Sequence, residues 1–145
     1  MVIGIIGENC SGKSTLADRI KQAIVAEIVT GKDYLRMAKS EHEAVALFRE
    51  KLAKAVSGEN LIYVISESEQ CRLLPDKAVR ILVYADIEMI KERFRARMRG
   101  NLPASVAKML ESRHGMFDDG SYDFRYDGVN GDADELCEAL KRLCR

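Results

Sequence analysis

The sequence predicts an α/β protein built on one five-stranded parallel sheet with helices on both faces. Short runs of aliphatic and β-branched residues alternate along the chain with longer segments whose apolar residues recur at helical spacing. Such alternation is typical of parallel sheets, because two parallel strands need a helical crossover between them. The chain has 145 residues, of which 47% are hydrophobic, and this suits one core and a single domain over 1–145.

Five segments are expected to form the strands. The first, 2–6, is made of aliphatic residues with one glycine and ends at Gly7, which indicates a strand buried on both faces. The other four are also rich in aliphatic or aromatic residues and lie at 26–30, 61–65, 79–84 and, with a weaker pattern, 122–126.

Helices are expected between and after these strands, at 14–25, 40–57, 86–98, 101–115 and 132–143. Two of them begin with a capping signature, since Ser40 is followed by Glu43 and Asp132 by Glu135. A side-chain oxygen at the first position can accept hydrogen bonds from backbone N–H groups that the first helical turn leaves free.

The charge balance and hydropathy argue against two kinds of partner. Lysine and arginine together number 23, as do aspartate and glutamate, so the formal net charge is zero. A protein that binds nucleic acid by neutralising phosphates would be basic. No apolar run approaches the ~20 residues that span a bilayer. We therefore expect neither a nucleic-acid nor a membrane partner.

The cysteines and the amino terminus point to a reducing compartment. The segment 1–7 has neither a basic leader nor a small-residue cleavage site, so we do not expect a signal peptide. The four cysteines and two histidines are scattered, which gives little support to a zinc site or a disulfide framework. They are Cys10, Cys71, Cys137, Cys144, His42 and His114. We expect a cytoplasmic protein with free thiols.

The first expected strand leads into a phosphate-binding loop. Residues 7–14 fit the pattern G-x-x-x-x-G-K-[ST], and they lie between an expected strand and an expected helix. Its two glycines allow backbone angles at which successive N–H groups point at a phosphate, and the start of the helix adds its positive dipole end. The residues expected to contact the nucleotide are Gly7, Glu8, Asn9, Cys10, Ser11, Gly12, Lys13, Ser14 and Thr15.

Two side chains of this loop have distinct expected roles. The ammonium group of Lys13 can reach the β- and γ-phosphates as a point charge, and the Ser14 hydroxyl can ligate Mg²⁺. The sequence therefore predicts a nucleotide-phosphate site, with ATP and Mg²⁺ as cofactors.

This loop, in a chain of 145 residues, resembles those of the small P-loop kinases, above all the nucleoside monophosphate kinases such as adenylate, cytidylate and guanylate kinase. The resemblance implies a sheet in the order 2-3-1-4-5, with a lid at about 95–112 and an acceptor-binding segment at about 31–60. It also implies phosphoryl transfer from ATP to a small acceptor.

A second resemblance lies in residues 86–97, where E-R-x-x-x-R follows the fourth strand, as it does before the mobile lid of such kinases. By position, Arg93 would stack on the base and Arg97 would clamp phosphate, while Arg113 matches a third family arginine more loosely. The alternative is a solvated helix face. Arg93 and Arg97 are i,i+4 neighbours and can converge on one anion, whereas Arg95 and Arg99 do not share that face.

The acceptor side carries less specific signals. Lys32, Asp33 and Arg36 follow the second strand and are expected at the carboxyl edge of the sheet, where an ordinary polar turn is the alternative. The D-G-F-P-R signature of adenylate kinases is missing, and 66–72 takes its place, ending in Arg72. Within that segment Glu67 resembles the acid that holds a Mg²⁺-bound water, and a solvated loop carboxylate is the alternative.

Three functions are compatible with these features. The first is an ATP-dependent kinase of a nucleotide or nucleoside, which the Arg93 and Arg97 spacing favours. The second is a kinase of a non-nucleotide alcohol, similar to shikimate kinase, in which Asp33 would act as the base. The third is a regulatory module that binds ATP without turnover, although such a module would not need a transition-state clamp.

Overall fold

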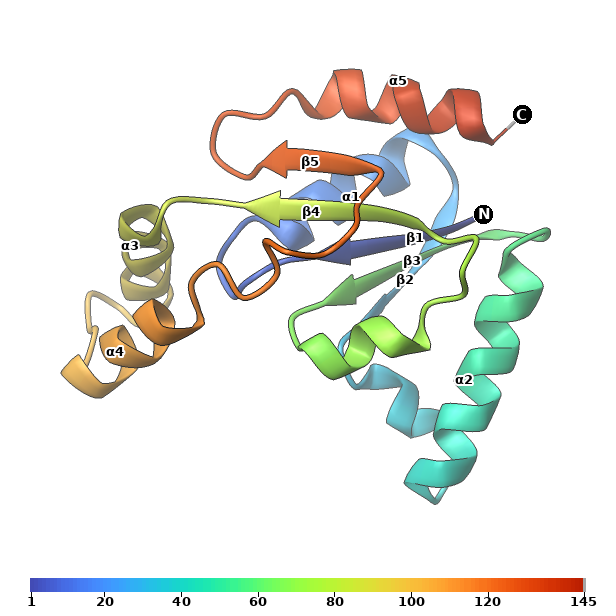
Figure 1. Ribbon diagram of the computed structural model, residues 1–145, viewed down its shortest axis with the longest axis horizontal. Coiled ribbons are helices and arrows are strands. Elements are labelled where there is room, and N and C mark those ends of the chain that lie inside the picture. The colour runs from blue at the N-terminus through green and yellow to red at the C-terminus, as the bar shows by residue number, and fades with distance from the viewer. Residues whose placement is uncertain (145) are drawn as a thin grey trace.

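Five parallel strands form one sheet in the order β2-β3-β1-β4-β5 in the computed structural model of the protein, which describes residues 1–144 (Figure 1). This confirms the expected sheet and its strand order. The strands are β1 (Val2–Ile6), β2 (Ala26–Thr30), β3 (Asn60–Ile65), β4 (Val79–Tyr84) and β5 (Phe124–Asp127). The fifth begins two residues later than the weak pattern at 122–126 indicates.

Helices cover both faces of the sheet. On one face, α1 (Lys13–Ala23) and α5 (Ala133–Leu143) pack over Ile3 and Ile5 of β1. On the other, α2 (Glu41–Ala55) packs over Tyr63 and Ile65 of β3 (Figure 1). Successive β1 side chains point to opposite faces, so an entirely apolar strand serves both cores.

The two capping signatures form as expected. The Ser40 hydroxyl accepts a hydrogen bond from the Glu43 backbone N–H at 3.2 Å. The Asp132 carboxylate accepts from the N–H groups of Asp134 and Glu135 at 3.0 and 3.1 Å. Each cap satisfies donors that the first helical turn cannot use, which explains why α2 and α5 begin where they do.

Two further helices, α3 (Ile87–Arg97) and α4 (Ala104–Arg113), lie beyond the carboxyl ends of the strands (Figure 1). The segment 95–112, which the kinase resemblance implies as a lid, thus consists of the end of α3, a turn and most of α4. Buried Ile90 and Leu110 join the two helices to Cys10 of the phosphate loop through a small apolar cluster of their own. No helix within 1–144 is long and apolar enough to cross a membrane.

Two short 3-10 helices are absent from the sequence expectations. They are η1 (Asp33–Met37), after β2, and η2 (Ser68–Leu73), after β3. Segments of one or two turns are too short to show a hydrophobic period, so the pattern of the sequence reads as loop. They follow neighbouring strands, so the residues of the expected acceptor side lie on short ordered elements rather than in open loops.

Candidate active site

The loop between β1 and α1 adopts the backbone expected of a phosphate cradle. Gly12, which precedes α1, has a φ of 113°, and Cys10 has a φ of 65°, so both lie in the left-handed region. A side chain at Gly7 would place its Cβ 2.4 Å from the Val83 carbonyl oxygen of β4, so only glycine fits there. The loop is therefore held tightly against the sheet, with α1 starting directly behind it.

Lys13 begins α1, and its side chain is folded into the loop. Its Nζ donates a hydrogen bond to the Glu8 carbonyl oxygen at 2.7 Å, and the residue is only 6% exposed. Burial, together with the positive charge of Arg97, lowers the pKa of Lys13 to about 8, and Cys10 and Glu8 partly offset these effects. A buried cation with one carbonyl partner is suited to bind an anion that enters the loop.

The loop also holds a polar atom that lacks a partner. The hydroxyl of Ser11 is buried and has no hydrogen-bond partner within residues 1–144. Such a group costs free energy when left unpaired, and a phosphate oxygen in the loop would satisfy it. The loop therefore fits a phosphate group.

The residues expected to hold Mg²⁺ are a hydroxyl on α1 and a carboxylate after β3. Ser14 and Thr15 lie exposed on the first turn of α1, and Glu67 lies after β3, the strand next to β1. No cluster of three or more histidine, cysteine, aspartate or glutamate side chains within 1–144 could hold a metal by itself. Mg²⁺ needs no such cluster in kinases, because substrate phosphates and water supply most of its ligands.

Arg93 joins three segments that are far apart in the sequence. From α3, its Nη1 donates to the Cys10 carbonyl oxygen at 3.1 Å and its Nη2 to the Gly128 carbonyl oxygen at 2.7 Å. Gly128 directly follows β5. The sequence did not indicate it as a site residue, because a single glycine after a weak strand pattern has no distinctive signature. The guanidinium plane is thus fixed between the phosphate loop and the β5–α5 turn.

A cavity of about 200 Å³ opens beside this bridge. Arg93 and Arg97 both line it, together with loop residues and the β5–α5 turn. Both members of the i,i+4 pair therefore line the same cavity. Arg95 instead pairs with Glu92 of its own helix, and Arg99 is exposed beyond the end of α3.

The end of α4 also contacts the phosphate loop. Arg113 Nη1 lies 3.6 Å from Glu67 Oε1, so the third candidate arginine and the candidate Mg²⁺ acid meet. The Glu8 carboxylate contacts His114 Nδ1 at 3.0 Å and the Gly115 backbone N–H at 3.1 Å. His114 is isolated in the sequence, and nothing local in either residue pointed to this contact.

The acceptor-side residues lie at the same edge of the sheet as the loop. The Gly31 N–H donates to the Val64 carbonyl oxygen, and the Gly7 N–H donates to the carbonyl oxygen of the next residue, Ile65. The segments that follow β2 and β1 therefore leave the sheet at the same end of β3. One strand separates β2 from β1, which sets their backbones about 10 Å apart. The start of η1 and the loop therefore lie at the same edge of the sheet, one strand apart.

The four acceptor-side candidates are exposed, and their side chains make no hydrogen bond or ion pair within residues 1–144. They are Lys32, Asp33 and Arg36 around η1 and Arg72 on η2. Arg72 contributes only its carbonyl oxygen, which accepts from Arg49 of α2 at 3.4 Å. Asp33 and Arg36 lie on η1 and Lys32 just before it, whereas Arg72 lies on a separate element.

The backbone beneath these charges is firmly held. The Tyr63 hydroxyl donates to the Gly31 carbonyl oxygen at 2.8 Å, and Gly31 itself has a φ of 53°. Tyr34 of η1 stacks on Phe48 of α2 with ring centroids 5.0 Å apart, and Phe48 meets Tyr63 edge-on at 4.9 Å. Asp33 is thus placed by an aromatic cluster that fixes the residues on both sides of it.

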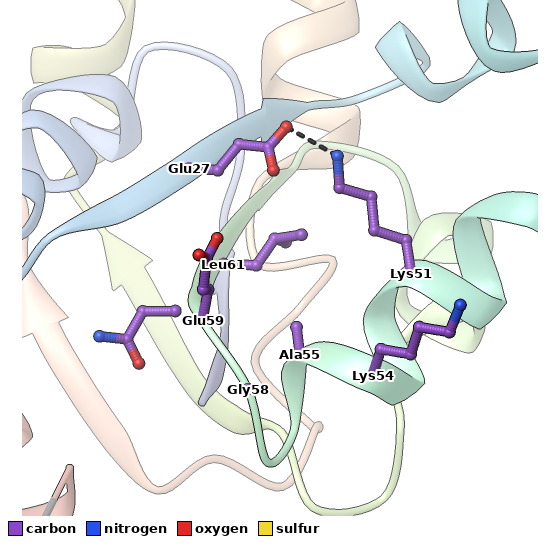
Figure 2. Close-up of a pocket in the computed structure, with 8 residues that line it drawn as sticks. Glu27, Lys51, Lys54, Ala55, Gly58, Glu59 and Leu61 are labelled. Atoms are coloured by element: carbon purple, nitrogen blue, oxygen red, sulfur yellow. Dashed lines mark hydrogen bonds and ion pairs between the residues drawn. The ribbon is translucent and has the colours of Figure 1, made fainter.

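Another groove lies far from this edge. It measures about 270 Å³ and lies where α2 ends and the amino-terminal part of the sheet begins, beside Glu27, Lys51 and Glu59 (Figure 2). Glu27 and Lys51 pair with each other at 2.8 Å, as the dashed line in Figure 2 shows. Its charges largely neutralise one another, and it has no connection to the phosphate loop.

No protein-family model matches the chain, and no curated protein matches it either. Solved structures do. A sugar kinase from Janibacter sp. HTCC2649 has a TM-score of 0.65 at 18% identity, covering 98% of this chain and 93% of that chain. A gluconokinase from Sinorhizobium meliloti 1021 has a TM-score of 0.63 at 17% identity, covering 98% and 92%.

A shikimate kinase from Acinetobacter baumannii in complex with shikimate has a TM-score of 0.62 at 13% identity, covering 99% of this chain and 92% of that chain. These likenesses support the P-loop kinase fold but not the narrower resemblance to nucleoside monophosphate kinases. At such identities they bear on the architecture alone. The chain has the fold of P-loop kinases.

Proposed function

We propose that the protein is an ATP-dependent kinase that phosphorylates a small acceptor bound between η1 and the phosphate loop. The observation that carries this proposal is the pair of buried polar groups inside the loop: the Lys13 ammonium, and the Ser11 hydroxyl, which has no partner within residues 1–144. Both are suited to oxygens of a nucleotide phosphate. The kinase structures that share the fold also support it.

The chemistry follows from where the charges lie. Phosphoryl transfer needs the attacking and leaving oxygens in line, and positive charge around the phosphate that moves. Lys13 supplies that charge from the loop, and Arg97, close enough to depress its pKa, supplies it from α3. Ser14 and Glu67 would hold Mg²⁺, which when bound neutralises charge on the phosphates.

We propose an alcohol as the acceptor class. An alcohol must lose a proton as it attacks, and a carboxylate can accept it. Asp33 is an exposed carboxylate whose backbone is fixed by Tyr63 and Tyr34, at the edge where the loop also ends. The printed names of the similar structures, a sugar kinase, a gluconokinase and a shikimate kinase, agree with this class.

A nucleotide acceptor is the second candidate, and one observation favours it. Lys32 and Arg36 flank Asp33 and have no partner within residues 1–144, as a site for an anionic acceptor would require. A phosphate acceptor is already anionic and needs positive charge rather than a base.

An acceptor screen tests the proposal. Sugars, sugar acids, other small alcohols, nucleosides and nucleoside monophosphates are assayed for acceptor-dependent ADP release, with the Lys13→Ala variant as the blank. If ATP binds and no acceptor raises ADP release, the chain is a nucleotide-binding module instead of a kinase.

The variant Asp33→Asn separates the two acceptor classes. For an alcohol, kcat should fall by several hundredfold while the acceptor still binds, because the base is lost. For a nucleotide, the loss in kcat should stay under about tenfold, and Arg36→Ala should chiefly raise the acceptor KM.

A further inference from the structure

The side chain of Glu8 needs an explanation that nucleotide binding does not provide. It is an acidic residue inside a loop whose purpose is to hold a polyanion, and like charges placed close together are destabilising. Its carboxylate is nevertheless only 13% exposed. Its carbonyl oxygen already accepts from Lys13, so the backbone serves the loop while the side chain is free for something else.

Both carboxylate oxygens of Glu8 are used on the same short segment. Oε1 lies 3.0 Å from His114 Nδ1, and Oε2 accepts from the Gly115 N–H at 3.1 Å. His114 is the residue at which α4 ends, and Gly115, with a φ of 81°, turns the chain away from it. A carboxylate here anchors the end of α4 directly to the phosphate loop.

Arg113 is the residue just before this anchor. Its guanidinium lies 3.6 Å from Glu67, which follows β3. Arg113, the last residue of α4, and His114, its C-cap, are therefore held by two acids that follow neighbouring strands, β1 and β3. The Glu8 contact is the more buried of the two, since the Arg113 and Glu67 side chains are 46% and 43% exposed.

We propose that Glu8 is a positioning residue, which docks the end of α4 on the phosphate loop and so places Arg113 beside the bound nucleotide. This inference rests on the proposed use of ATP. Glu8 itself need not touch the nucleotide through its side chain. It links the loop, where phosphate would bind, to the helix that carries the third arginine.

A double-mutant cycle tests whether Glu8 acts through Arg113. The probe is a fluorescent, non-hydrolysable ATP analogue with Mg²⁺, and the variants are Glu8→Ala, Arg113→Ala and the double variant, with the exposed Glu69→Ala as the control. Each single variant should weaken binding by about fivefold or more, and the double variant hardly further, because the two residues act as one unit.

The outcomes are distinct. Losses that multiply in the double variant, or a Glu8→Ala variant that binds like wild type, would overturn the positioning role. A wild-type protein that fails to bind the analogue would instead remove the proposed function itself, whatever the variants do.

Hydrogen exchange tests the contact without any nucleotide. Glu8→Ala should speed exchange of the amides around Gly115 by at least about fivefold relative to wild type and Glu69→Ala, because the acceptor of that N–H is lost. Unchanged exchange there would contradict the docking.

The variant Glu8→Gln adds a rescue readout. Its amide oxygen can still accept a hydrogen bond from the Gly115 N–H, whereas an alanine side chain cannot. Glu8→Gln should therefore bind the analogue severalfold more tightly than Glu8→Ala. Equal binding by the two variants would count against the inference.

Discussion

The two sides of the sheet edge are built in opposite ways. On the nucleotide side, charged groups are bound to distant parts of the same chain: Arg93 to Cys10 and Gly128, and Glu8 to the end of α4. On the acceptor side, the buried ring of Tyr34 holds the backbone, while the charges of Lys32, Asp33 and Arg36 have no partner within residues 1–144.

This difference separates what is preassembled from what would need a ligand. A guanidinium that already donates two hydrogen bonds keeps its place before any ligand binds, and such preorganisation lowers the cost of binding. Exposed charges on a firm backbone keep their rotamer freedom until an acceptor orders them. Substitutions on the two sides should therefore affect different steps.

The largest effect is expected for Lys13→Ala on the nucleotide side. Loss of the charge that meets the β- and γ-phosphates should lower turnover by on the order of 10²-fold or more, while the variant stays folded. Lys21→Ala, an exposed lysine of the same helix, is the control. ATP binding and turnover that both survive Lys13→Ala would show that the loop is not the catalytic cradle.

The second-largest effect is expected for Arg97→Ala, compared with Arg95→Ala on the same helix. Arg97 lines the cavity beside the loop, whereas Arg95 pairs with Glu92. Arg97→Ala should raise the barrier to transfer by at least roughly 2 kcal/mol more than Arg95→Ala, about 30-fold in kcat. Similarly small losses of kcat for Arg97→Ala, Arg95→Ala and Arg99→Ala would rule out a clamp role for Arg97.

Activity and stability are expected to depend on pH with opposite signs because of Lys13. The pKa of Lys13 is lowered to about 8, so above that pH the loop loses its charge and kcat/KM for ATP should fall by up to about tenfold per pH unit. Folding should respond the other way. The unfolded chain keeps its lysine proton up to about pH 10.4, so this residue makes the free energy of unfolding rise with pH between the two values.

Urea titrations of wild type and Lys13→Ala over that pH window check the predicted rise in unfolding free energy. ATP kinetics check the predicted fall in kcat/KM. If the difference in unfolding free energy between the two proteins is independent of pH, Lys13 is not held in a desolvated place.

The smallest effect is expected on the acceptor side, for Tyr63→Phe. This substitution removes the hydrogen bond to the Gly31 carbonyl oxygen. It should lower the free energy of unfolding by about 1 kcal/mol and raise the acceptor KM about fivefold. ATP affinity should not change, and the exposed Tyr84 supplies the control variant Tyr84→Phe. An equal loss of ATP affinity would mean that the two sides are not separable.

Local features of the sequence determined most of the architecture. Apolar runs predicted five strands, helical spacing predicted the five α-helices to within a few residues at their ends, and Ser40 and Asp132 marked two helix starts. The phosphate loop was recognisable because it needs glycines and a lysine at fixed spacing. The 3-10 helices η1 and η2 were missed because elements this short carry no period.

The contacts that complete the site were decided only by the tertiary structure. Arg93 and Cys10 are 83 residues apart, and Glu8 and His114 are 106 apart. The sequence alone determined the elements and the loop, because period, capping and glycine requirements are local properties. Which carboxylate meets which end of α4, and which carbonyl oxygens hold Arg93, depend on how α3 and α4 pack beyond the sheet, and no local pattern encodes that packing.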